Sequence, residues 1–161
     1  MSFKVGFGYD VHKFKKGRDL ILGGVKIDYE YGLEGYSDAD CLVHAVCDAI
    51  LGAAGLGDIG EIFPDNDERY KDANSLLFLK HIGDVIKKNG YAISNVDVTV
   101  AMQSPKIAAY KHAMIEKMSS VLNIDNKKIN IKATTTEGLG FEGRLEGVSA
   151  YAVVLLENLH E

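Results

Sequence analysis

The chain has no excess of basic residues, few cysteines and prolines, and no long apolar segment. Its 18 Lys and Arg against 23 Asp and Glu give a formal net charge of −5, which argues against nucleic acid as the main partner because phosphate backbones require basic surfaces. No apolar run approaches the roughly 20 residues that span a bilayer, and no cationic leader with an apolar core precedes the first predicted strand. We therefore expect no membrane partner and a cytoplasmic location, either bacterial or as a mature organellar form.

The scarce cysteines and prolines also narrow the fold. Cys41 and Cys47 are six positions apart on a predicted helix and point in different directions, so we predict neither a disulfide nor a thiolate metal site. Pro64 and Pro105 both fall in predicted loops, which leaves the helices and strands uninterrupted. With 161 residues, 47% hydrophobic and 25% charged, and no repeat or linker, the chain is predicted to form one globular domain over 1–161.

Hydrophobic periodicity and turn residues predict an order of elements that mixes strands and helices. Ser37, followed three positions later by Asp40, resembles a capping box and predicts a helix that begins near Asp38. Asp72 or Asn74 is the predicted cap of the next helix. The predicted strands cover 3–10, 20–25, 93–102, 129–135 and 148–156, and the predicted helices cover about 38–52, 74–89 and 107–122.

The first strand carries a candidate metal site at its end. Apolar side chains alternate with Lys4, Gly6, Gly8 and Asp10, the period of a strand with one buried face, and that predicted buried face consists of Phe3, Val5, Phe7 and Tyr9. Asp10 and His12 then share the other face, with side chains that start about 6.6 to 7 Å apart. A carboxylate and an imidazole at this spacing can converge on one ion, although an Asp–His pair without metal has the same pattern.

His44 is the third candidate ligand. It lies on the predicted helix one turn from Asp40 and one turn from Asp48, and either carboxylate could accept the proton of its second ring nitrogen. A half-buried histidine satisfied by such an acid is the simpler interpretation of His44 alone. Together with Asp10 and His12, however, it completes the three protein ligands of a zinc site with one open position.

Three polar loops contain candidate substrate ligands. In 57–67, Asp58 and Asp65 could accept hydrogen bonds from substrate hydroxyls, or could be solvated turn residues. Lys106 could neutralise a phosphate, or could simply be solvated. In 134–144, consecutive threonines, glycines and Arg144 suit a phosphate or diphosphate, and Glu137 could add an oxygen ligand to a magnesium ion.

These motifs together resemble a known family over essentially the whole chain. The sequence is similar to the 2-C-methyl-D-erythritol 2,4-cyclodiphosphate synthase family of the methylerythritol phosphate route to isoprenoids. The motifs that carry this resemblance are Gly8-Tyr9-Asp10-Val11-His12, Ser37-Asp38-Ala39-Asp40, Gly57-Asp58-Ile59-Gly60, Phe63-Pro64-Asp65, Lys132-Ala133-Thr134-Thr135-Thr136-Glu137 and Gly140-Phe141-Glu142-Gly143-Arg144. The resemblance implies a compact α/β (α+β) subunit with helices on one face of a mixed sheet, and a homotrimer with active sites between adjacent chains.

The resemblance also implies a reaction. The 2-phosphate of 4-diphosphocytidyl-2-C-methyl-D-erythritol 2-phosphate would attack the β-phosphorus in line, CMP would leave, and a cyclic diphosphate would form. Because this nucleophile is already anionic, the protein has to fold the substrate and neutralise crowded charge rather than supply a strong base.

Residue roles implied by the resemblance cover most of the motifs. Zinc would bind Asp10, His12 and His44; magnesium or manganese would bind Glu137 together with the substrate phosphates; and Thr135 would stabilise the transition state. Phe141 and Arg144 would line an axial cavity for an isoprenoid diphosphate. Substrate-binding positions would be Tyr36, Ser37, Asp58, Ile59, Gly60, Phe63, Asp65 and Asp67 on the methylerythritol and phosphate side, and Met102, Lys106, Ile107, Ala108, Ala133, Thr134, Thr135, Thr136 and Glu137 on the cytidine diphosphate side, with Phe141 and Arg144 beyond them.

One position departs from the family pattern. Many members have a histidine where this chain has Tyr36. A tyrosine hydroxyl donates one hydrogen bond but is not cationic near neutral pH. We therefore predict a neutral contact between Tyr36 and the substrate phosphates, or that Ser37 takes over this contact.

Two other function classes remain open from the residues alone. One carboxylate and two imidazoles also form the facial triad of non-haem iron oxygenases, which iron content and oxygen dependence would reveal. A non-catalytic module that binds isoprenoid or nucleotide diphosphates is the second, and it would need neither Glu137 nor His44 for turnover.

Overall fold

The sheet is built around its first strand, β1 (Ser2–Lys16). The computed structural model describes residues 2–160 and places five strands in the order β4-β1-β7-β5-β6. β5 and β6 are parallel and the other pairs are antiparallel, so the sheet is mixed, as predicted. The remaining strands of this sheet are β4 (Tyr31–Leu33), β5 (Tyr91–Ala101), β6 (Ile129–Thr134) and β7 (Gly147–Asn158).

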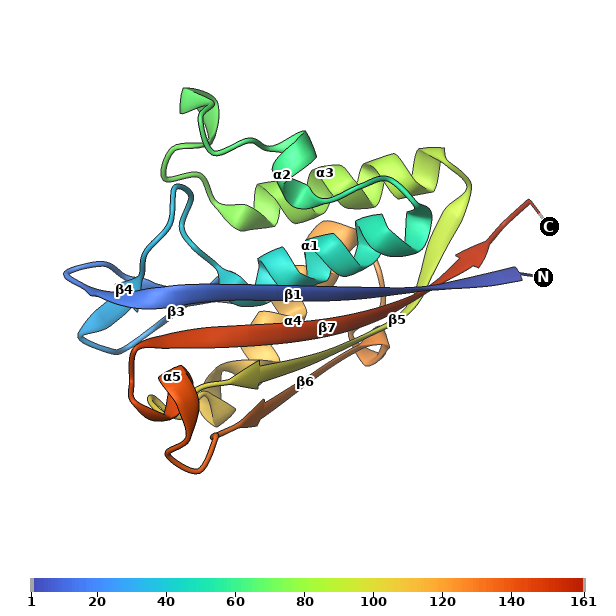
Figure 1. Ribbon diagram of the computed structural model, residues 1–161. Helices are drawn as coiled ribbons and strands as arrows, with labels where there is room; N and C mark the ends of the chain where they lie inside the picture. The colour runs from blue at the N-terminus through green and yellow to red at the C-terminus, as the bar shows by residue number, and fades with distance from the viewer. Residues whose placement is uncertain (1, 161) are drawn as a thin grey trace.

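Three long helices lie on one side of the sheet (Figure 1). They are α1 (Cys41–Ala54), α3 (Ser75–Lys88) and α4 (Lys111–Leu122). The shorter elements are the hairpin strands β2 (Leu20–Leu22) and β3 (Val25–Ile27), the helices α2 (Ile59–Ile62) and α5 (Gly140–Gly143), and the 3₁₀ turns η1 (Glu68–Tyr70), η2 (Ala108–Tyr110) and η3 (Asn126–Lys128). The architecture is thus the single α+β domain with a mixed sheet that was predicted. Within residues 2–160 no helix combines the length and apolarity needed to cross a bilayer.

The inner face of β1 was predicted wrongly. Gly6 and Gly8 are buried against α1, whereas the predicted core residues of 3–9 point away from the helices. A Cβ added to Gly6 or Gly8 would lie only 1.8 Å from Ala49 O or 1.9 Å from Ala45 O, so only glycine lets the helix approach this closely. Exposed on the outer face are Phe3, Val5, Phe7, Tyr9 and Val11, at 52%, 69%, 61%, 43% and 42%.

The start of α1 also differs from the prediction. The N-cap is Asp40, whose side chain accepts from Val43 N, and not Ser37. Asp40 is fully buried, and its carboxylate also accepts hydrogen bonds from the N–H groups of Gly23 and Gly24 in the β2–β3 turn. One carboxylate therefore joins the helix start to the hairpin, a long-range role that a local capping pattern does not reveal.

Several smaller expectations also need correction. β1 continues beyond its predicted end at residue 10 as far as Lys16, because β4, which was not predicted, pairs with this part of it. The loop 57–67 contains α2. On α3, Asn74 is the N-cap, one of the two predicted candidates, and Leu77 is exposed whereas Phe78 is buried. Cys41 and Cys47, both within the described part of the chain, are buried free thiols, as expected.

Candidate metal centre and ligand cavities

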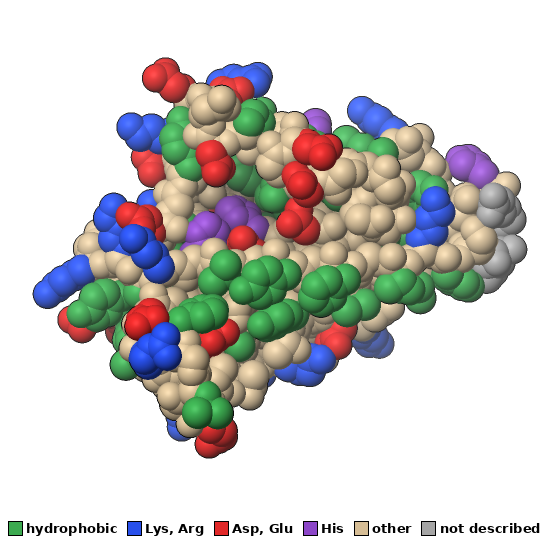
Figure 2. Space-filling model, viewed as in Figure 1, with side chains coloured by type: hydrophobic (Ala, Val, Ile, Leu, Met, Phe, Trp, Pro, Cys, Tyr) green, Lys and Arg blue, Asp and Glu red, His purple; other side chains and the backbone are tan. Residues whose placement is uncertain are grey.

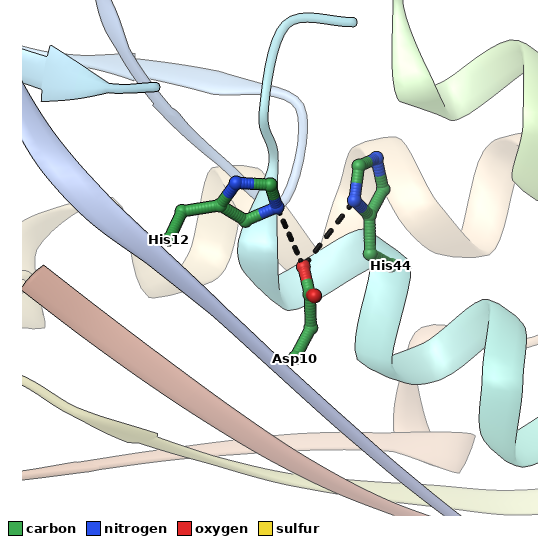
Figure 3. Close-up of side chains that lie close together, drawn as sticks. All are labelled: Asp10, His12 and His44. Atoms are coloured by element: carbon green, nitrogen blue, oxygen red, sulfur yellow. Dashed lines mark ion pairs between the residues drawn. The ribbon is translucent and has the colours of Figure 1, made fainter. Parts of the chain in front are cut away.

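Asp10, His12 and His44 converge at the junction of β1 and α1 (Figure 3). Asp10 Oδ2 lies 2.9 Å from His12 Nε2 and 3.3 Å from His44 Nδ1. All three potential ligand atoms lie within 4.8 Å of one another. Because Gly6 and Gly8 allow α1 to rest directly on β1, the histidine of the helix reaches the two side chains of the strand.

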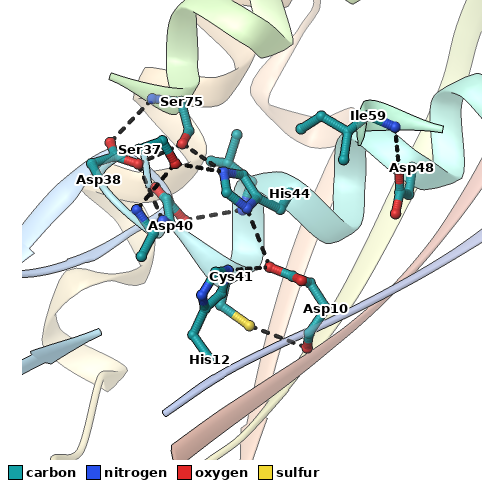
Figure 4. Close-up of polar contacts among 12 residues, drawn as sticks. Asp10, His12, Ser37, Asp38, Asp40, Cys41, His44, Asp48, Ile59 and Ser75 are labelled. Atoms are coloured by element: carbon teal, nitrogen blue, oxygen red, sulfur yellow. Dashed lines mark hydrogen bonds and ion pairs between the residues drawn. The ribbon is translucent and has the colours of Figure 1, made fainter. Parts of the chain in front are cut away.

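Backbone and side-chain partners hold the two imidazoles in place. His12 Nδ1 lies 2.6 Å from the carbonyl oxygen of Glu34, so this nitrogen donates and Nε2 is left facing Asp10. His44 Nε2 lies 2.8 Å from Ser75 Oγ and 3.3 Å from Ser37 Oγ, which leaves Nδ1 facing Asp10 (Figure 4). Both rings therefore aim one nitrogen at the same carboxylate oxygen.

The expected carboxylate partner of His44 was wrong. Asp40 is occupied by backbone N–H groups, and Asp48 accepts from Ile59 N at 2.8 Å. Ser75, the first residue of α3, takes the position instead, because α1 and α3 pack side by side. The spacing of residues along α1 cannot reveal a partner of His44 that lies on another helix.

The charges of the three groups are coupled. Burial alone would raise the pKa of Asp10, but the neighbouring imidazoles of His12 and His44 lower it to about 2. Burial alone would lower the pKa of His12, but Asp10 raises it above 6.5. The carboxylate is therefore ionised over the whole physiological range, as a metal ligand must be.

The arrangement fits a metal ion. Asp10 Oδ2 and His12 Nε2 are buried and, among residues 2–160, neither has a partner in hydrogen-bond geometry despite their 2.9 Å separation. Such buried orphan atoms are rare in folded proteins. Ligand atoms of a tetrahedral zinc ion lie about 3.3 Å from one another, close to the 2.9 and 3.3 Å that separate Asp10 Oδ2 from the two imidazole nitrogens. Asp10, His12 and His44 can therefore hold a metal ion.

A cavity of about 210 Å³ opens beside these three residues. Phe63 forms one wall and stacks on Phe78 with 4.4 Å between ring centroids. The predictions did not include Phe78, Tyr70 or Gly35. The cavity is lined by Asp10, His12, Gly35, Tyr36, Ser37, His44, Ile59, Gly60, Phe63, Asp65, Tyr70 and Phe78.

A second cavity, also of about 210 Å³, lies at the ends of β5 and β6. It combines apolar walls with the amino groups of Lys106 and Lys111 and the hydroxyls of two threonines. Gln103, Pro105 and Lys111 were not among the predicted binding residues. The lining residues are Met102, Gln103, Pro105, Lys106, Ile107, Ala108, Lys111, Ala133, Thr134 and Thr135.

Six predicted site residues line neither cavity. Asp58 caps α2 and Asp67 caps η1, where it also pairs with Arg69. Arg144 is paired with Glu146 at 3.0 Å. Glu137 is exposed, in the left-handed backbone region at φ 55°. The six residues are Asp58, Asp67, Thr136, Glu137, Phe141 and Arg144.

The two cavities are far apart within one chain. They share no lining residue. Sheet register aligns Val11 with Ser149, Ser149 with Ala101, and Ala101 with Thr134. Thr134 is thus level with the metal-binding end of β1 but three strand spacings away, about 14 Å.

Comparison with known proteins identifies close relatives. The model of the YgbB family matches residues 3–157. The 2-C-methyl-D-erythritol 2,4-cyclodiphosphate synthase of Syntrophomonas wolfei is 54% identical over 96% of this chain and 98% of its own length. The enzyme of the same name from Caldicellulosiruptor bescii is 56% identical over the same shares.

Solved structures agree. IspF of Plasmodium falciparum, solved as a CDP complex, superimposes with a TM-score of 0.86 at 39% identity, covering 98% of this chain and 97% of the other. The bifunctional IspDF of Campylobacter jejuni gives a TM-score of 0.94 at 45% identity over 99% of this chain. This chain spans 44% of the length of that bifunctional protein.

Proposed function

Because this chain belongs to the YgbB family of 2-C-methyl-D-erythritol 2,4-cyclodiphosphate synthases, we propose that Asp10, His12 and His44 bind zinc and that Glu137 binds magnesium or manganese. The reaction is the metal-dependent conversion of 4-diphosphocytidyl-2-C-methyl-D-erythritol 2-phosphate to the 2,4-cyclodiphosphate with release of CMP. The observation that carries the zinc assignment is the convergence of three ligand atoms within 4.8 Å. Zinc, when bound, polarises the phosphoryl oxygens and offsets their charge.

The cavity beside Asp10, His12 and His44 is the proposed pocket for the methylerythritol and its phosphates. Asp65 accepts hydrogen bonds from sugar hydroxyls, while the ring of Phe63, backed by Phe78, excludes water from the carbon skeleton. Tyr36 and Ser37 contact phosphate oxygens at the mouth. A Tyr36→Phe variant with unchanged turnover and substrate affinity would remove the proposed Tyr36 contact.

The second cavity is the proposed cytidine diphosphate pocket. Apolar walls and backbone groups suit a nucleoside, and Lys106 lies where it can neutralise a diphosphate oxygen. The hydroxyls of Thr134 and Thr135 are exposed at its edge. Thr135 stabilises the in-line transition state, where charge concentrates on the equatorial oxygens. The CDP bound in the Plasmodium falciparum relative supports a nucleotide pocket in this chain.

A homotrimer joins the two cavities. Within one chain the two cavities share no lining residue and lie about three strand spacings apart, whereas an adjacent chain can bring its own nucleotide cavity to the metal. The outer face of β1 and β7 supplies the required surface: apolar side chains form a band across the sheet (Figure 2), made of Phe3, Val5, Phe7, Tyr9, Val11, Tyr151 and Val153. Such a band is larger than the isolated apolar side chains of ordinary surfaces.

The trimer axis is also the proposed site of an isoprenoid diphosphate. Phe141 is half-buried and Arg144, three residues later, is exposed, so this segment offers an apolar group and a cation. Titration of farnesyl diphosphate into the trimer, with no heat released, would remove this proposal.

Phosphorus NMR tests the whole assignment. The purified protein, incubated with the diphosphocytidyl substrate, zinc and magnesium, should release CMP and the cyclic diphosphate. The His44→Ala variant should bind less than one zinc per chain and give no product. Product formation by a metal-free His44→Ala variant would refute the metal assignment. Iron content with oxygen dependence would point to the oxygenase alternative instead.

A further inference from the structure

Ser75 and Asp38 lie behind His44, on the side away from Asp10 (Figure 4). Ser75 Oγ is fully buried, 2.8 Å from His44 Nε2, and it donates to Asp38 Oδ1 at 2.5 Å. Neither residue lies within a motif typical of metal binding. Three segments, the 37–40 loop, α1 and α3, meet at this contact.

The donor and acceptor of each hydrogen bond from Asp38 through Ser75 to His44 can be assigned by starting at Asp38. Asp38 accepts from two backbone N–H groups, Asp40 N to Oδ1 at 3.1 Å and Ser75 N to Oδ2 at 3.1 Å, and a backbone N–H can only donate. The carboxylate is therefore an acceptor, so the Ser75 hydroxyl proton points to it. The Ser75 lone pairs then face His44, and Nε2 must carry the proton that lies between them.

We infer that Asp38 and Ser75 are positioning residues that hold His44 with Nε2 protonated and the Nδ1 lone pair directed at the metal. This inference rests on the proposed function, because it assumes that Nδ1 binds an ion. A protonated nitrogen cannot bind a metal, so the tautomer decides whether His44 is a ligand. The carboxylate also polarises the serine, which makes the imidazole more basic.

Ser37 is the competing partner. Its hydroxyl lies 3.3 Å from His44 Nε2, and Ala39 N donates to it at 3.3 Å. Both contacts are longer than the Ser75 contact, and no carboxylate fixes the direction of the Ser37 proton. Ser37 therefore does not replace Ser75.

Zinc affinity, measured by competition with a chromophoric chelator, tests the inference. Ser75→Ala should bind zinc about 10- to 100-fold more weakly and should regain turnover at saturating zinc. Ser119→Ala is the matched control: Ser119 is another buried helical serine, bonded to the carbonyl oxygen of Glu116 on α4, and its loss should leave zinc affinity unchanged. Equal zinc affinity of Ser75→Ala and the unmodified protein would overturn the inference.

A double variant tests whether Asp38 acts through Ser75. Asp38→Asn alone should weaken zinc binding, but Asp38→Asn combined with Ser75→Ala should bind no more weakly than Ser75→Ala, because the contact to His44 is already gone. If the double variant instead bound zinc more weakly by the product of the two single effects, Asp38 would act independently of Ser75. That result would overturn the role inferred for Asp38. In the zinc-loaded unmodified protein, nitrogen NMR should show a slowly exchanging His44 Nε2 proton, and its absence would overturn the inference without any variant.

The outcomes separate the two claims. If the unmodified protein and His44→Ala bind zinc equally, the proposed metal site fails. If only His44→Ala loses zinc, while Ser75→Ala retains full affinity, the metal site stands and the positioning role of Ser75 fails.

Discussion

The two faces of β1 differ in their side chains and in what they contact. The inner face has no side chain at Gly6 and Gly8, then the charged and polar ligands Asp10 and His12, and α1 rests directly on it. The outer face is a row of aromatic and aliphatic side chains open to the surroundings of the chain. The difference shows that a single strand can bring a helix to a metal site by the absence of side chains, and present an assembly surface by their presence.

The largest effect is expected from filling the inner face. Gly8→Val would place a Cβ 1.9 Å from Ala45 O, and since neither backbone can move without separating β1 from α1, we expect about 5 kcal/mol or more of lost stability, which is most of a typical domain's total. Urea unfolding measures this. The matched control is Gly52→Ala within α1, where an added Cβ meets only Phe7 O at 3.9 Å; it should be neutral or slightly stabilising.

The next effect removes the chemistry of the inner face and leaves its packing. His12→Ala takes away one of three candidate ligands, and turnover should fall about a thousandfold, about 4 kcal/mol, because metal charge stabilisation is lost. Dialysis of the unmodified protein against a chelator should cause the same loss, reversed by zinc. Turnover of His12→Ala within tenfold of normal would contradict the assignment.

A substitution on the outer face of β1 should disrupt assembly without unfolding the chain. Phe7→Glu puts a charge at the centre of the apolar band, where each buried phenyl ring would contribute about 2 to 3 kcal/mol to assembly. We expect a folded monomer that binds zinc but does not turn over. Light scattering and circular dichroism check this. Leu77→Glu, another exposed apolar position but on α3, should leave the oligomer intact.

The smallest expected effect is a pH dependence of zinc binding at the inner face of β1, which assembly through the outer face should not share. Asp10 raises the pKa of His12 above 6.5, and zinc must displace the His12 proton, so zinc affinity should rise about tenfold per pH unit, about 1.4 kcal/mol, until pH passes this raised pKa. In the metal-free protein, the ion pair between Asp10 and His12 stabilises the fold below pH 6.5. This stabilisation is lost as the pH rises through the raised pKa of His12. Calorimetric zinc titrations at several pH values test this. Phe3, Val5, Phe7 and Val11 do not titrate, so the oligomeric state should not follow the same curve.

Much of the fold was readable from local patterns. Asn74, one of the two predicted caps of α3, is its N-cap, and the strands predicted over 93–102, 129–135 and 148–156 end within two residues of their predicted limits. Period-two alternation at 3–10 showed that β1 has two faces. It could not show which face is inside, because the answer depends on how closely a helix 40 residues later approaches two glycines.

The site was readable where its residues follow one another in the chain. Asp10 and His12 share a strand face, and His44 was placed on the helix that meets them. Ser75, Phe78 and Lys111 were not found, because each reaches its cavity or partner from an element packed beside the motif rather than within it. The assignments of Glu137, Phe141 and Arg144 stay predictions, since they depend on a neighbouring chain.

The pairing of β1 with β7 also sets the order of folding. These strands align from Ser2 with Asn158 to Lys13 with Gly147, so strands about 140 residues apart in the sequence pair with one another. Contacts of such long sequence separation form slowly, because a large loop must close before they contribute. Asp10 and His12 therefore lie on a strand whose pairing with β7 cannot form until β7 has been synthesised.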